Sequence, residues 1–160
     1  MQSRGATLEA IEAVYRRRGA DFFRFAVART GDPEIAQDAV QEGFARAIRS
    51  RRGFRASGSL EAWIGRCVLN AARDGADRAP TPEHESPEAT TWIPESVDES
   101  VREAVRRLPA RQRDALFLRI YLDFDYASIA ETLGIEVGTV SATLHAARLT
   151  LAQALQEVTR

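Results

Sequence analysis

Apolar residues recur at helical spacing along most of the chain, and no segment shows the two-residue alternation of a half-buried strand. In the N-terminal half this pattern predicts four helices, over residues 7–18, 21–29, 33–49 and 60–77, the first pair separated at Gly19. In the C-terminal half it predicts helices over residues 97–108, 110–122, 126–133 and 140–158. We therefore expect an all-α fold of two small helical domains joined by a flexible linker.

Short signals mark where several of these helices begin and end. Asp32-Pro33-Glu34 combines an N-cap, a proline at the first helical position and an acid in the first turn. Ser59 is placed to cap the helix after it. Gly134 can take the positive φ that ends a helix, and Thr139 can cap a new helix from Val140.

Apolar stripes at four-residue spacing predict the buried faces of two helices. The stripe of the 33–49 helix consists of Ala36, Val40, Phe44 and Ile48. The stripe of the last helix consists of Val140, Leu144, Leu151 and Leu155.

Residues 126–140 have the parts of a helix-turn-helix in the right order. Ile129 and Leu133 lie four apart on one helix face, and Ala130 is small enough for a second helix to cross closely. Two helices joined in this way place the second where a DNA major groove can receive it. An αα-hairpin that only packs is the alternative, and the Ala130–Gly134 spacing followed by Gly-Thr-Val favours DNA.

An acidic, proline-rich segment separates the two halves. Residues 78–96 hold four of the six prolines and lack helical periodicity, which is typical of a linker. Arginines against acidic residues number 14 to 10 in residues 1–79, 0 to 6 in residues 80–100, and 8 to 7 in residues 101–160. The predicted organisation is a domain over 1–78, a linker over 79–96 and a domain over 97–160.

Composition excludes several classes of protein. The chain is 44% hydrophobic and 28% charged, which is ordinary for a soluble globular protein, and no apolar run could span a bilayer. The single Cys67 excludes an intrachain disulfide, and Met1–Ala10 lacks the apolar core of a signal peptide, so we expect a cytoplasmic protein. All 22 basic residues are arginine, which favours bidentate phosphate contacts, although a genome rich in G and C would give the same bias.

The chain carries no recognisable catalytic constellation. His84 and His145 have no Cys, Asp or Glu partner at ligand spacing, and Cys67 lies on the apolar face of a predicted helix. Gly53 and Gly58 lack the preceding strand of a phosphate-binding loop. We expect no enzyme activity, no cofactor, no metal and no small-molecule substrate.

Four segments, in order, resemble the extracytoplasmic-function group of bacterial RNA polymerase sigma factors. Residues 31–44 are similar to the polymerase-binding helix of region 2, and Trp63-Ile64 with residues 70–74 to its next helix. Leu108–Arg113 and Ile129–Ser141 are similar to region 4. The resemblance covers nearly the whole chain and implies a protein that binds core RNA polymerase and directs promoter recognition, melting and transcription initiation.

The resemblance also implies three sets of binding residues. The set that would contact polymerase is Asp38, Gln41 and Glu42. The set that would contact the −10 element, around a basic loop over residues 49–59, is Arg51, Arg52, Phe54, Arg55, Ser57, Trp63, Asn70 and Arg73. The set that would contact the −35 element is Thr139, Ser141, Ala142, Thr143, His145 and Arg148.

Residue chemistry supports these sets and leaves alternatives open. The acidic patch can pair with partner arginines, or it can be a solvated helix face. The basic loop can hold phosphate while Phe54 stacks on a base. Two residues have a structural alternative. Trp63 can pack in the core, and Arg73 can form a salt bridge with Asp74 or Asp77. The recognition face departs from the family pattern because Arg148 is its only cation, so bidentate readout of guanine is not available at positions 141–147.

We therefore interpret the chain as a sigma factor whose partners are core RNA polymerase and promoter DNA, with an anti-sigma factor as a further candidate partner that nothing in the sequence identifies. A stand-alone helix-turn-helix regulator that binds duplex DNA as a dimer is the alternative, and a helical protein-interaction module is a third class. The six acidic groups of residues 80–100 suggest that the linker screens the basic loop in the free protein, against the simpler view that it is a soluble tether.

Overall fold

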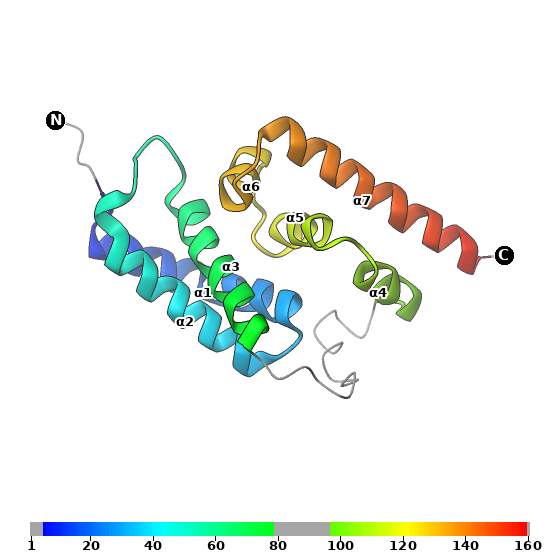
Figure 1. The fold of residues 1–160 in the computed structure, drawn as a ribbon, viewed down its shortest axis with the longest axis horizontal. Helices are drawn as coiled ribbons and strands as arrows, with labels where there is room; N and C mark the ends of the chain where they lie inside the picture. The colour runs from blue at the N-terminus through cyan, green and yellow to red at the C-terminus, as the bar shows by residue number, and fades with distance from the viewer. Residues whose placement is uncertain (1–4, 79–96, 160) are drawn as a thin grey trace.

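The computed structural model describes residues 5–78 and 97–159, and every regular element in those ranges is helical (Figure 1). The elements are α1 (Leu8–Thr30), α2 (Pro33–Ser50), a short 3₁₀ turn η1 (Arg51–Gly53), α3 (Leu60–Arg78), α4 (Glu99–Arg106), α5 (Ala110–Tyr121), α6 (Tyr126–Leu133) and α7 (Val137–Val158). The expected all-α fold is confirmed. The segment predicted as a linker, and with it the predicted contact between linker and basic loop, lies outside the described residues.

Three of the predicted helix ends are confirmed by their local hydrogen bonds. Asp32 Oδ1 accepts from the backbone N–H groups of Glu34 at 2.8 Å and Ile35 at 3.3 Å, so it caps α2. Ser59 Oγ accepts from the N–H of Ala62 at 3.2 Å and caps α3. Gly134 ends α6 in the left-handed conformation, with φ of 67°.

The predicted break at Gly19 is wrong, since α1 runs without interruption from Leu8 to Thr30. Glycine inside a helix costs only about 1 kcal/mol relative to alanine, and packing readily exceeds this. Val14 and Phe22, on either side of Gly19, are both buried in the core. The two helices predicted on either side of Gly19 are therefore one helix, and residues 5–78 contain three α-helices instead of the predicted four.

The predicted start of the last helix is also wrong by about one turn. Helix α7 begins at Val137, and its N-cap is Glu136, whose carbonyl accepts from the N–H groups of Thr139 at 3.0 Å and Val140 at 3.1 Å. Thr139 therefore lies inside the first turn and caps nothing. Capping propensity favoured threonine, but the short turn after Gly134 brings the chain into helical geometry earlier.

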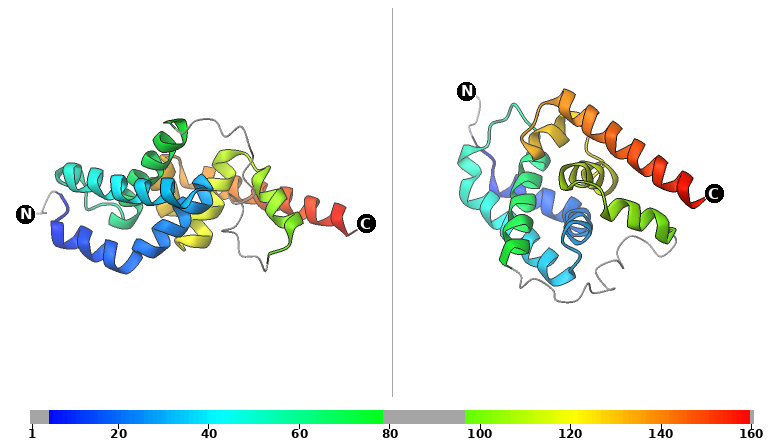
Figure 2. Two further views of the ribbon diagram at one scale, coloured as in Figure 1. Left: turned by 90° about the horizontal axis from the view of Figure 1, so that it is seen from below. Right: turned by 45° about the vertical axis from the view of Figure 1, so that its right-hand side comes forward.

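The two halves pack against each other to form one body (Figures 1 and 2). Within the N-terminal half α1, α2 and α3 pack together, and within the C-terminal half α7 packs along α4, α5 and α6. Between the halves, α3 contacts α6 and α1 contacts α5. One continuous core of buried side chains runs through both halves, from Ile11 in α1 to Leu144 in α7.

The apolar stripes are buried except toward the C-terminal ends of their helices, and Leu151 in α7 is half-buried. Ala36, Val40 and Phe44 are buried in α2, as are Val140 and Leu144 in α7. In contrast, Ile48 and Leu155 are each 40% exposed, so their predicted burial is wrong. Both lie toward the C-terminal ends of their helices, and the end of α7 projects beyond its neighbours (Figure 1).

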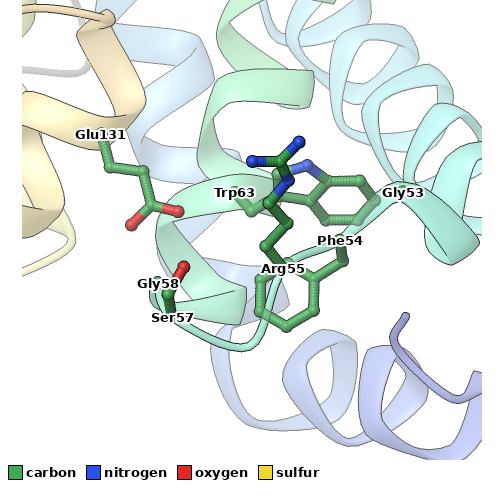
Figure 3. Close-up of a pocket in the computed structure, with 7 residues that line it drawn as sticks. All are labelled: Gly53, Phe54, Arg55, Ser57, Gly58, Trp63 and Glu131. Carbon is green, nitrogen blue, oxygen red and sulfur yellow. The ribbon is translucent and has the colours of Figure 1, made fainter. Parts of the chain in front are cut away.

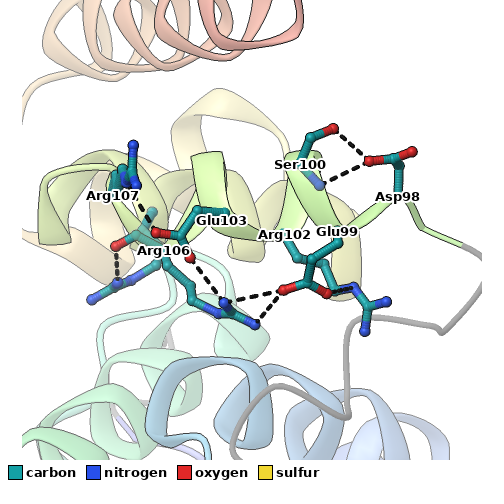
Figure 4. Close-up of polar contacts among 8 residues, drawn as sticks. Asp98, Glu99, Ser100, Arg102, Glu103, Arg106 and Arg107 are labelled. Atoms are coloured by element: carbon teal, nitrogen blue, oxygen red, sulfur yellow. Dashed lines mark hydrogen bonds and ion pairs between the residues drawn. The ribbon is translucent and has the colours of Figure 1, made fainter. Parts of the chain in front are cut away.

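Helix α4 is stabilised on its polar side by a series of charged contacts (Figure 4). Asp98 Oδ1 caps it by accepting from the N–H of Ser100 at 2.8 Å. Glu103 pairs with Arg106 at 2.9 Å and with Arg107 at 3.0 Å, at the spacing where helical neighbours meet. These local contacts support an eight-residue helix that would be marginal alone.

Candidate promoter and polymerase interfaces

A pocket of about 430 Å³ opens where the basic loop faces the start of α3 (Figure 3). Its lining consists of Gly53, Phe54, Arg55, Ser57, Gly58, Trp63 and Glu131. Four residues of the predicted −10 set, Phe54, Arg55, Ser57 and Trp63, are thus brought together. The pocket joins an aromatic wall to small residues and an arginine, which is the chemistry that a splayed nucleotide requires.

The aromatic wall is formed by Phe54 and Trp63, whose ring centroids lie 5.5 Å apart at an angle of 55°. Both side chains are half-buried, so Trp63 packs on the core and borders the pocket at once. The loop is held by the N-terminal segment, because the N–H of Gly5 donates to the Phe54 carbonyl at 3.1 Å and that of Ala6 to the Arg51 carbonyl at 2.8 Å. The aromatic surface is therefore fixed before any ligand arrives.

The arginines of the −10 set differ in whether their guanidinium groups already have partners within the protein. Arg52 and Arg55 are exposed. The guanidinium of Arg51 donates to the carbonyl of Ile48 at 2.9 Å and is held at the end of α2. Arg73 donates to Asp114 of α5 at 3.3 Å.

The predicted partners of Arg73 are not the ones found. Asp74 accepts from Arg46 of α2 at 2.9 Å, and the side chain of Asp77 lies outside the described residues. Asn70, one turn before Arg73, is exposed. Asn70 and Arg73 therefore belong to one stretch of α3, with Arg73 turned toward the C-terminal half.

The predicted polymerase-binding residues lie on the outer side of α2. Asp38 and Gln41 are exposed, whereas Glu42 accepts from Arg46 and from Arg49, each at 3.0 Å. These hydrogen bonds, with the one from Arg46 foremost, hold the pKa of Glu42 below its ordinary value. A hollow of about 290 Å³ beside Gln41, also lined by Tyr15, Gly19, Phe23, Gln37 and Val40, was not anticipated from the sequence.

The predicted −35 residues lie along the first half of α7. Thr139, Ser141, Ala142, His145 and Arg148 are all exposed. Thr143 is half-buried, and its hydroxyl donates to the Thr139 carbonyl at 2.6 Å within the helix. Five of the six residues therefore face solvent and can meet a groove.

Sequence reasoning missed two acidic residues that lie against the −10 set. Glu131 of α6 lines the pocket, where its Oε2 accepts from the N–H of Ser59 at 3.1 Å. Asp114 of α5 is 1% exposed and contacts Arg73 and Arg29. No spacing signal could have found these contacts, since Glu131 lies 72 residues from Ser59 and Asp114 lies 41 from Arg73.

Residues 5–78 and 97–159 also bear on metal binding, thiol chemistry and membrane insertion. No group of three His, Cys, Asp or Glu side chains in this part of the chain is arranged to hold a metal ion. Cys67 is half-buried beside the core, and burial raises the pKa of its thiol. None of the described helices is both long and apolar enough to cross a bilayer.

Comparison with known proteins places both halves in one family. The family model for Sigma-70 region 2 matches residues 14–79, and that for Sigma-70 region 4 matches residues 98–151. The ECF RNA polymerase sigma factor SigM of Mycobacterium tuberculosis is 31% identical over 151 residues, covering 91% of this chain and 77% of SigM.

Solved structures share the fold at lower identity. CnrH, in complex with the cytosolic domain of CnrY, matches with a TM-score of 0.73 and 20% identity over 98% of this chain and 94% of its own. The sigma factor RpoE of Bartonella quintana, in complex with the anti-sigma factor NepR, matches with a TM-score of 0.61 and 22% identity over 91% of this chain and 98% of its own.

The chain belongs to the family of ECF RNA polymerase sigma factors. It is a transcription initiation factor that binds core RNA polymerase and directs it to promoters. The alternative of a stand-alone helix-turn-helix regulator is not favoured, because a region 2 precedes the helix-turn-helix.

Proposed function

We propose a division of labour in which residues 1–78 bind polymerase and capture the −10 element, and residues 97–160 bind the −35 element, with residues 79–96 joining them. Each half alone binds its promoter element weakly. Polymerase holds both at a fixed spacing, so their free energies of binding combine on one promoter.

The pocket of the basic loop is the observation that carries this proposal. Phe54 and Trp63 present two aromatic faces, and stacking a base on such a face is worth about 1–3 kcal/mol. Arg52 and Arg55, both exposed, can neutralise the flanking phosphates. A base that is held in the pocket cannot pair with its partner strand, so capture favours the melted promoter.

Polymerase is engaged through the outer face of α2. Asp38 and Gln41 are free to meet a basic partner surface. Glu42 contributes through its two arginines, which fix the carboxylate in one orientation. The hollow beside Gln41 supplies a place for an apolar side chain of the partner.

The −35 element is bound by the exposed face of α7. Its side chains are small and polar, and Arg148 is the one cation among the six assigned residues. This favours recognition by groove shape and phosphate contact over guanine readout. Binding to this element then depends on the tether to polymerase.

Partners and location follow the same reasoning. RpoE was solved with an anti-sigma factor, and the shared fold supports an anti-sigma partner for this chain as well. The proposed role needs neither catalysis nor a cofactor, and it places the protein in the cytoplasm, where polymerase acts.

Run-off transcription on a promoter library, after pull-down of core polymerase, tests the proposal. We expect transcripts that depend on both the chain and core enzyme, with the chain monomeric when free. A dimer that protects a palindromic duplex without polymerase, and that supports no transcription, would instead establish the stand-alone regulator.

A further inference from the structure

The short segment before α1 lies against the basic loop and holds the backbone of Phe54. The N–H of Gly5 donates to the Phe54 carbonyl at 3.1 Å, and the N–H of Ala6 donates to the Arg51 carbonyl at 2.8 Å. The same Arg51 carbonyl accepts from the N–H of Phe54 at 3.3 Å. Both backbone hydrogen-bonding groups of Phe54 are therefore engaged, and its ring leaves the chain from a fixed point.

Gly5 makes this contact possible because it has no side chain. Its φ of 105° lies in a region that residues with a β-carbon rarely adopt. A β-carbon at Gly5 would also lie 3.0 Å from the Arg51 carbonyl oxygen and 3.0 Å from Cα of Arg52. An alanine at position 5 must therefore either move the segment away from the loop or displace the loop itself.

The segment is anchored to the helical core on its other side. Ala6 packs against the core cluster, and the next residue, Thr7, is the N-cap of α1. Beyond Phe54, by contrast, residues 55–58 are all exposed. The position of the Phe54 ring beside Trp63 thus depends on the hydrogen bonds that this segment makes.

We propose that Gly5 is a positioning residue for capture of the −10 strand. It allows the segment to lie against the loop, and the segment fixes the Phe54 ring beside Trp63 before a base arrives. Capture then does not have to order the loop, which lowers its entropic cost. Gly5 acts through Phe54 and does not touch the base, and the inference rests on the proposed role of the loop pocket in −10 capture.

The test measures permanganate reactivity of the −10 element with core polymerase and the full chain carrying Gly5→Ala. Melting should be slowed roughly three- to tenfold, which is part of the loss expected when a base no longer stacks. Polymerase should co-purify as with the wild type and the thermal midpoint should be unchanged, which separates positioning from a loss of fold.

Gly75→Ala is the matched control, because it makes the same substitution in the same half of the chain. Gly75 lies within α3, and a β-carbon there would meet Ile35 at an ordinary van der Waals distance of 3.5 Å. The described glycines with positive φ are Gly5, Gly31 and Gly134, so Gly75 needs no unusual backbone conformation. Gly75→Ala should melt the promoter like the wild type.

A double-mutant cycle with Phe54→Ala shows whether Gly5 acts through Phe54. In the Phe54→Ala background, Gly5→Ala should slow melting by less than about twofold, because the ring that it positions is gone. Slowing of the same size in both backgrounds would mean that Gly5 acts independently of Phe54, and it would overturn the inference.

Hydrogen exchange supplies a readout that is independent of DNA. The amides of Ala6 and Phe54 should exchange faster in Gly5→Ala than in the wild type, since each donates to the Arg51 carbonyl. Faster exchange together with slower melting supports the inference. Unchanged exchange would show that the contact tolerates a side chain at position 5, and the inference would be overturned.

The two single variants separate failure of this inference from failure of the proposed function. If Phe54→Ala slows melting and Gly5→Ala does not, the pocket captures the strand without positioning by Gly5, and only the inference is overturned. If neither variant slows melting, the loop is not the capture site, and the proposed function fails together with the inference.

Discussion

The two surfaces assigned to promoter DNA differ in what already lies against them. The recognition face of α7 is open to solvent, yet Arg148 is the one cation of its assigned set. The −10 surface has the richer chemistry, with two aromatic rings and several arginines. Glu131 of the other half lines its pocket, and Asp114 pairs with its Arg73. One surface is open but has a single cation, whereas the other combines aromatic rings and arginines with two carboxylates of the other half.

The largest effect should come from a change that disables both surfaces together. Replacing Asp38 and Glu42 with Arg puts positive charge on the outer face of α2, so core polymerase should no longer co-purify with the chain. Glu12→Arg on α1, which likewise replaces an exposed carboxylate paired with an arginine, is the control and should co-purify normally. Wild-type yield of polymerase with the double variant, at unchanged helicity, would refute the assignment of this face.

A smaller effect should be confined to the pocket of the basic loop. Trp63→Ala removes an aromatic wall of the pocket and should slow open-complex formation by roughly 10- to 100-fold, since a stacked base is worth about 1–3 kcal/mol. Trp63→Phe keeps an aromatic face and should retain most of the activity. Equal loss in the two variants, or a loss that tracks thermal stability alone, would make Trp63 a core residue only.

The open surface should respond more weakly. Arg148→Ala should lower affinity for duplex −35 DNA by less than about tenfold and reduce the slope of log affinity against log salt by about 1, as expected for one lost phosphate contact. Arg107→Ala, which removes an exposed arginine paired with Glu103, is the control and should leave the slope unchanged. A change of base preference with Arg148→Ala would show direct readout, contrary to our account.

The smallest effect concerns the N-cap of α6, the first helix of the helix-turn-helix. Asp125 caps α6 by accepting from the N–H of Ser128 at 2.7 Å, and this bond holds its pKa below the ordinary value. Asp125→Ala should lower the free energy of unfolding by about 1 kcal/mol at neutral pH. Because the pKa is lowered on folding, the carboxylate stabilises the fold above the ordinary pKa and loses this effect as the pH falls through the folded value.

Denaturation at two pH values checks the sign. The difference between wild type and Asp125→Ala should be constant near neutral pH and should shrink below about pH 4, where the wild-type carboxyl becomes protonated. A difference that grows on acidification would show that Asp125 stabilises α6 by another route.

Signals between neighbouring residues predicted most of the helices, but they could not predict contacts between residues far apart in the sequence. The caps at Asp32 and Ser59 and the turn at Gly134 depend on neighbouring residues, so the sequence alone indicates them. The continuity of α1 through Gly19 depends on tertiary packing that overrides propensity. The contact of Glu131 with the basic loop depends on how two halves dock, which no spacing within either half encodes.

The division of labour is tested most directly by footprinting one promoter with polymerase and either Phe54→Ala or Arg148→Ala. Permanganate reports melting at the −10 element, and nuclease protection reports occupancy at the −35 element. We predict that Phe54→Ala loses permanganate reactivity while the −35 protection remains, and that Arg148→Ala weakens protection while melting persists in the complexes that form. Unchanged melting with Phe54→Ala, or loss of both signals together in each variant, would contradict the account.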